Sequence, residues 1–174
     1  GASVPFKYKG ANQTSIITGD TSNFASGVGN WIGYSGGAVA AAADDWTGDS
    51  GTGQIKMTFN SSGNCGISTS GNVLTAGKRY RVSIEAKLIS GNSTALGIGS
   101  NDASAGTNGT NRMVFTPTGT ETVFTGEFTS NGSAKLYILD DGENSGNEVF
   151  AFDDFTVTPI GAVAEYDGSG ITND

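Results

Sequence analysis

Apolar and polar residues alternate along several short stretches of this chain. In residues 54–59 the side chains of Ile55, Met57 and Phe59 fall on one side, and in residues 79–88 every second residue from Tyr80 onward is apolar. A period of two predicts strands that bury one face. Helical periodicity is nearly absent. By the same criterion, further strands are predicted over residues 15–18, 94–98, 112–116, 121–129, 135–139 and 149–158. Residues 38–43 are a candidate for one helical turn, but the glycines before them and Asp44-Asp45 after them favour a strand with small side chains.

Clusters of Gly, Asn and Ser separate these stretches, and the chain holds 28 glycines. Many short strands at such spacing predict an all-β fold, an antiparallel β-sandwich of the jelly-roll type. Apolar residues make up 36% of the sequence, which is enough for one core in a domain of this size. We expect the sandwich to span residues 14–160. Residues 1–13 are then a leading segment, and residues 161–174 are a C-terminal linker.

The last predicted strand contains two adjacent carboxylates, Asp153 and Asp154. Simple alternation puts Asp153 on the same face as Phe155 and Val157. A carboxylate in an apolar row needs a cation or several hydrogen bonds, because burying an unpaired charge is costly. Asp154 would then lie on the opposite face, in water.

Charge and the missing residue types exclude several functions. The net charge is -8 and no basic stripe is present, so neither nucleic acid nor an anionic membrane is an expected partner. No stretch is apolar enough to cross a membrane. The chain has no histidine and a single cysteine, Cys65, which excludes histidine-based triads, cysteine-rich zinc sites and internal disulfides. We expect Cys65 to be a small buried apolar residue.

The acidic run over residues 140–148 does not have the spacing of a calcium-binding loop, and we expect it to be a solvated turn. Glycosidases need a pair of carboxylates placed around the scissile bond. The carboxylates of this chain occur in no such signature context, so we expect a protein that is not an enzyme.

Three stretches together resemble a known family. Residues 16–31 contain a short strand, Asn23-Phe24, glycines and Trp31; residues 74–87 read Leu-Thr-Ala-Gly-Lys-Arg-Tyr-Arg-Val-Ser; and the third stretch is the Asp153-Asp154 strand. They are similar to the jelly-roll carbohydrate-binding modules that bind xylan, cellulose and other β-glucans. The resemblance covers about residues 14–158. It implies a non-catalytic module that binds polysaccharide or a cell-surface glycan.

The resemblance also implies a structural calcium held by Asp153. The family carries a glutamate after the phenylalanine of its first motif, whereas this chain has Ala25 there. A calcium ion would then use other oxygens, and Asp20, Asn23 and backbone carbonyls are the candidates.

Aromatic side chains are the candidate sugar-binding residues. Trp31, Tyr34 and Trp46 occur among glycines and polar residues, and Tyr137 faces away from Leu136 and Ile138 on its strand. A flat ring can stack on the apolar CH face of a sugar and loses little entropy on doing so. Alternatively, the two tryptophans belong to the core, since tryptophan is highly buried on average.

A second resemblance concerns the ends of the chain. Residues 4–10 and 160–166 look like segments that flank such domains in bacteriophage tail and virion-surface proteins. This implies an alternative function, a structural or decoration domain of a phage capsid or tail that docks on other virion proteins and has no glycan affinity. Either function predicts an extracellular or virion-surface location.

Overall fold

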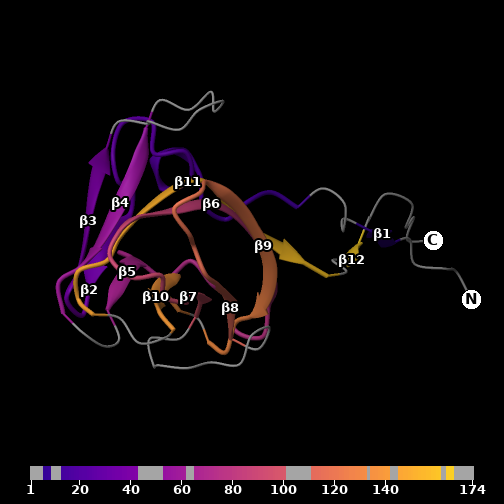
Figure 1. Ribbon diagram of the computed structural model, residues 1–174. Helices are drawn as coiled ribbons and strands as arrows, with labels where there is room; N and C mark the ends of the chain where they lie inside the picture. Colours follow the sequence, from indigo (N-terminus) through magenta and orange to yellow (C-terminus); the bar gives the residue numbers. More distant parts are fainter. Residues whose placement is uncertain are drawn as a thin grey trace, which may run out of the picture.

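The computed structural model describes residues 6–8, 13–42, 53–61, 65–100, 111–132, 134–141, 145–161 and 164–166. Within these ranges the chain forms two five-stranded antiparallel sheets, which face each other as a β-sandwich of the jelly-roll type (Figure 1). A short 3-10 turn, η1 (Gly19–Thr21), precedes them. No helix among the described residues is long and apolar enough to span a membrane.

The first sheet has the strand order β2-β5-β10-β7-β8, and the second has the order β3-β4-β11-β6-β9. The strands of the first sheet are β2 (Trp31–Tyr34), β5 (Gly66–Thr69), β10 (Tyr137–Asp140), β7 (Leu96–Gly99) and β8 (Arg112–Phe115). Those of the second sheet are β3 (Gly37–Ala42), β4 (Gln54–Phe59), β11 (Val149–Ile160), β6 (Arg79–Ser90) and β9 (Thr122–Thr129).

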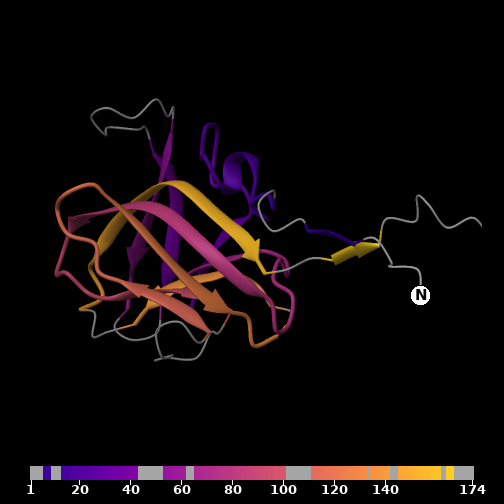
Figure 2. The ribbon, with the colours of Figure 1, turned by 90° about the vertical axis from the view of Figure 1, so that its right-hand side faces the viewer.

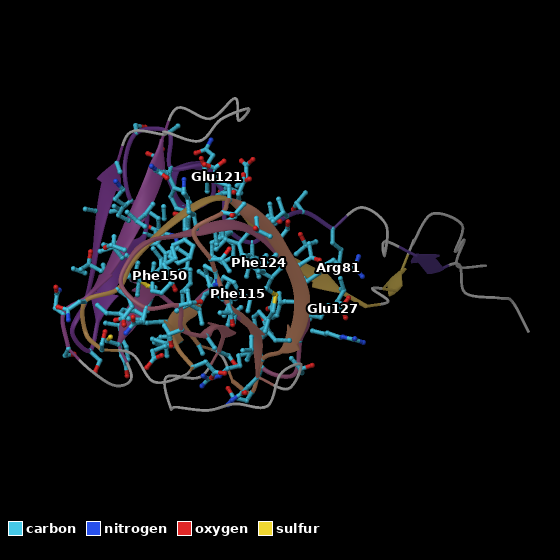
Figure 3. All side chains as sticks on the ribbon, viewed as in Figure 1. Arg81, Phe115, Glu121, Phe124, Glu127 and Phe150 are labelled. Carbon is cyan, nitrogen blue, oxygen red and sulfur yellow. The ribbon has the colours of Figure 1, made fainter. Side chains whose placement is uncertain are left out.

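The core lies between the inner faces of the two sheets. Figure 3 shows Phe115, Phe124 and Phe150 pointing into this space, whereas Arg81 and Glu127 point away from it on the second sheet. The rings of Phe115 and Phe124 pack with centroids 4.9 Å apart, which joins β8 of one sheet to β9 of the other. The alternation in β4 and β6 has the predicted effect, because Ile55, Met57 and every second residue from Tyr80 to Ala86 are buried.

The predicted orientation of Asp153 is wrong, because β11 contains a β-bulge next to it. The register against β6 shifts between Asp153 and Thr156, and Asp154 has a positive φ of 43°. Phe152 therefore faces the core before the bulge, and Phe155 faces it after the bulge. Asp153 lies on the outer face of the second sheet, opposite Glu85, and not in line with Phe155. Asp154 is exposed, as predicted.

Two short strands on either side of the sandwich in the sequence pair with each other outside it. β1 (Phe6–Tyr8) pairs with β12 (Ala164–Tyr166) in an antiparallel ribbon that lies beside the sandwich in both Figure 1 and Figure 2. A hydrogen bond from Gln13 Nε2 to the Gly161 carbonyl also links the two segments. Residues 6–8 of the leading segment are thus paired with residues 164–166 of the C-terminal linker.

Candidate functional site

The outer face of the first sheet brings together two of the predicted sugar-binding residues. Trp31 and Ile138 belong to the core, so Tyr34 on β2 and Tyr137 on β10 point outward. Their rings meet edge to face, with centroids 5.3 Å apart and an interplanar angle of 78°. Both side chains are half-buried, and Ile32 beside them is 43% exposed. This is an accessible aromatic pair on a rigid sheet.

Glycines leave the neighbouring outward positions without side chains. Gly66 on β5 lies opposite Tyr34 and Leu139, and Gly99 on β7 lies opposite Tyr137. A Cβ at Gly66 would lie 2.1 Å from the Ile138 carbonyl oxygen, and one at Gly99 would lie 2.0 Å from that of Asn111. Glycine in a strand interior is typical of a close approach by backbone or ligand. Here it is the adjacent strand that approaches.

A buried ion pair covers the other end of this face. Arg112 on β8 is 2% exposed and pairs with Asp141, which directly follows β10. The Arg112 side chain lies over Gly97, where an added Cβ would be 2.7 Å from Arg112 Cδ. The Asp141 amide donates to the Ala95 carbonyl over 2.8 Å, which holds the segment in place. The pair therefore joins β8 to the segment after β10.

The predicted calcium ligands are only partly gathered. Asp153 is 1% exposed, and its Oδ1 accepts the Asp154 amide at 2.7 Å. Asp20 Oδ1 accepts hydrogen bonds from the amide and hydroxyl of Ser26, and Asn23 Oδ1 accepts the Ala25 amide. Both side chains therefore bind groups within their own loop.

That loop nevertheless reaches β11 next to Asp153. The Ser22 carbonyl accepts the Phe155 amide, and the Ser22 hydroxyl donates to the Phe155 carbonyl. Among the described residues no group of three or more His, Cys, Asp or Glu side chains could hold a metal ion. The residues present offer a calcium ion one buried carboxylate, together with carbonyl and amide oxygens. Calcium accepts such a set of ligands.

The comparison with protein families agrees with this architecture. Residues 19–139 match the family described as "Carbohydrate binding domain". The chain belongs to this family. It is a non-catalytic domain, in agreement with the prediction from its sequence.

Solved structures share the fold of this carbohydrate binding domain at low sequence identity. An arabinose-bound GH51 α-L-arabinofuranosidase, MgGH51, has a TM-score of 0.64 at 15% identity, over 86% of this chain and 27% of that enzyme. The CBM22-1 xylan-binding domain of Xyn10C from Paenibacillus barcinonensis has a TM-score of 0.55 at 15% identity, over 93% of this chain and 100% of that domain.

The enzymatically active domain of tailspike protein 4 from bacteriophage CBA120 has a TM-score of 0.51 at 12% identity, over 84% of this chain and 22% of that protein. The chain thus spans about a quarter of the arabinofuranosidase and of the tailspike domain. No curated protein matches the chain.

Trp31 is not available for stacking on a sugar in this carbohydrate binding domain. It is 1% exposed, its ring stacks on Phe155 with centroids 5.5 Å apart, and its indole N–H donates to the Thr21 carbonyl at 3.0 Å. Of the two interpretations of Trp31, the platform is therefore wrong and the core position is the one observed, with the indole N–H hydrogen-bonded there. Trp46 lies outside the described residues. No sequence pattern indicated that Arg112 and Asp141 would pair, because they are 29 residues apart along the chain.

The acidic run at residues 140–148 is not a solvated turn in its described part. Asp140 is 4% exposed, Asp141 pairs with Arg112, and Glu148 is fully buried. The Glu148 carboxylate accepts the Ser145 hydroxyl at 2.6 Å and the amides of Ser145, Gly146 and Asn147 at 2.9–3.0 Å. Burial raises the pKa of Glu148, but these hydrogen bonds outweigh it and lower the pKa to about 2.

Cys65 is buried, as predicted. Burial, together with the nearby charge of Asp140, raises the pKa of its thiol to about 11. The thiol is therefore protonated at neutral pH and unreactive.

Proposed function

We propose that this carbohydrate binding domain binds a xylan-type polysaccharide on the outer face of the first sheet. The observation that carries the proposal is the accessible pair of Tyr34 and Tyr137 on two strands of that face. Tyrosine offers a large flat surface and a hydroxyl, and it has few rotamers to lose on binding. The xylan-binding domain with the same fold supports the choice of sugar class. The domain acts as one part of an extracellular protein, and stacking positions the glycan without any chemistry.

Removal of either tyrosine ring tests this proposal. We expect Tyr137→Ala and Tyr34→Ala to weaken binding of xylotriose by at least about tenfold, the effect of losing a central aromatic contact. Isothermal titration calorimetry measures the change, and circular dichroism checks that the variants are folded. Val123→Ala is the matched control, because Val123 is 59% exposed but lies on the second sheet. Equal xylotriose affinity in the parent domain and all three variants would contradict the proposed location of the binding site.

A structural calcium ion at Asp153 forms a second part of the proposal. The buried carboxylate of Asp153, backbone carbonyls of the loop around Ser22, and the side chains of Asp20 and Asn23 would hold it. The ion would join the loop to β11 and supply no chemistry to sugar binding.

Thermal unfolding with and without EDTA tests the calcium site. A ligand that binds only the folded state stabilises it by about 2.7 kcal/mol at a concentration 100 times its Kd. We therefore expect calcium to raise Tm after EDTA treatment, and we expect Asp153→Asn to abolish this rise. Asp154→Asn serves as the control, because Asp154 is exposed. A calcium response that survives Asp153→Asn would place the ion elsewhere.

The virion context stays a prediction of the sequence. Likeness to a tailspike domain at 12% identity concerns the fold alone. If neither tyrosine contributes to glycan binding and the domain instead associates with virion proteins, the decoration function replaces the one proposed here.

A further inference from the structure

Tyr34 and Tyr137 come from strands that are not neighbours in the first sheet, because β5 lies between β2 and β10. Adjacent strands lie about 4.8 Å apart, so the backbones of β2 and β10 are separated by roughly 10 Å. The ring centroids are nevertheless only 5.3 Å apart. The two side chains therefore lean toward each other over β5, where Gly66, the residue opposite Tyr34, has no side chain in the way.

The pair combines two phenol rings that solvent can reach. Both side chains are half-buried, so part of each is open to a small reagent. The third tyrosine of the sandwich, Tyr80, is 2% exposed, and its ring stacks on Phe128 and not on a second phenol. Within the described part of the sandwich, the contact between Tyr34 and Tyr137 is thus the one that joins two accessible phenols.

Two phenols in contact have a defined oxidative reaction. A one-electron oxidant removes one electron from each ring, and each hydroxyl releases its proton, which leaves two phenoxyl radicals. The radicals combine to form one carbon–carbon bond between ring positions next to the hydroxyls. The hydrogens on these two carbons then leave as protons, and the two oxygens take up protons again. In total two electrons and two protons are lost, and the product is dityrosine.

The fold favours this coupling within one molecule. Holding two reacting groups close together replaces a bimolecular encounter by a unimolecular step, which raises the rate by a large factor. The rings meet edge to face at 78°, so one ring must turn before the two ring edges can join. Side chains with solvent exposure make such turns on the nanosecond timescale or faster. The two radicals of one domain can therefore combine before either meets a second molecule.

We infer that Tyr34 and Tyr137 form a modification site, at which a one-electron oxidant produces an intramolecular dityrosine cross-link. The cross-link ties β2 to β10 directly, across β5. Its formation requires only the contact between the two rings and the oxidant. It does not depend on glycan binding, so the inference goes beyond the proposed function and does not rest on it.

Photo-oxidation of the folded domain with tris(bipyridyl)ruthenium and persulfate tests the inference, since persulfate accepts the electrons and becomes sulfate. Tyr8→Phe and Tyr166→Phe are introduced first, so that the tyrosines of the β1–β12 ribbon cannot contribute. We expect a monomeric product that has lost two hydrogens, in which peptide mass spectrometry finds Tyr34 linked to Tyr137. The yield of this product should not change with protein concentration, because the coupling is intramolecular.

Single substitutions in this background identify the partners. Tyr137→Phe and Tyr34→Phe each keep the ring but cannot form a phenoxyl radical, so we expect the yield of the intramolecular product to fall by at least about tenfold. Tyr80→Phe is the matched control and should leave the yield unchanged, because Tyr80 is buried against Phe128. Circular dichroism checks that each variant is folded. A yield that Tyr137→Phe does not lower, or a product that consists only of concentration-dependent dimers, would overturn the inference.

Discussion

At the scale of single residues, Glu148 shows how a buried charge is held in this fold. Its two carboxylate oxygens accept one hydroxyl and three amide hydrogen bonds from residues 145–147. Its backbone carbonyl also accepts the Phe59 amide at 2.9 Å, which ties the turn to β4. The ionised form is therefore the one that the native turn requires.

The lowered pKa of Glu148 predicts a loss of stability in acid. The folded-state pKa is about 2, compared with an ordinary value of 4.5, so the stabilisation is complete above about pH 5 and is lost as the pH falls toward 2. We expect Glu148→Gln to lower the free energy of unfolding by on the order of 2 kcal/mol at pH 7, the usual value of hydrogen bonds to a charged group. The difference from the parent domain should shrink toward pH 2.

Urea unfolding at several pH values measures this difference. Glu127→Gln is the control: hydrogen bonding from Arg81 also lowers the pKa of Glu127, but that pair is exposed, and exposed pairs contribute little. A Glu148→Gln effect that does not vary with pH would contradict the assigned cause.

Residue-scale prediction from the sequence failed where partners are remote. The glycines and asparagines around Trp31 indicate an exposed loop, yet its indole stacks on Phe155 and donates to Thr21. Alternation predicted that Asp153 shares a face with Phe155, but the bulge at Asp154 reverses the faces. Side chains alternate between the two faces only while the strand has no bulge, and no residue pattern around Asp154 predicts a bulge there.

At the scale of elements, β7 depends on its two glycines. A Cβ at Gly99 would lie 2.0 Å from the backbone oxygen of Asn111, the residue before β8, which cannot move without distorting the sheet. A Cβ at Gly97 would meet the side chain of Arg112, which has some freedom to shift. The outward side of β7 is thus closed to any larger residue.

We therefore expect Gly99→Ala to lower the free energy of unfolding by about 1–3 kcal/mol, the range for overpacking. We expect Gly97→Ala to lower it by less. Gly119→Ala is the control, because nothing lies within 4 Å of its added Cβ. Chemical denaturation measures all three variants. Equal stability of Gly99→Ala and Gly119→Ala would contradict the close packing of β7 against β8.

The strands differ in how well their sequence predicts them. Residues 54–59 form β4 with the predicted bounds, because three apolar side chains alternate with polar ones. β5 was not predicted, since Gly66 and Ser68 look like linker residues even though the strand is buried throughout. β2 was missed as well, for a similar reason. Residues 15–18 form no strand, although Ile16 donates a hydrogen bond to the Val157 carbonyl beside β11.

At the scale of the whole molecule, the candidate site is assembled by topology. Tyr34 and Tyr137 are far apart in the sequence and meet because β5 pairs with both β2 and β10. Sequence patterns predicted that Tyr137 faces away from the core, and they predicted the all-β fold. They could not predict the pairing of the strands, which decides the partner of each ring.

A nuclear magnetic resonance titration with xylotriose tests the central claim, the location of the sugar site, most directly. We expect shifts of backbone amides to concentrate in β2, β5 and β10 around Tyr34 and Tyr137, with β6 and β9 of the second sheet unchanged. Shifts concentrated on the outer face of the second sheet, or saturating shifts that spare β2 and β10, would contradict the account.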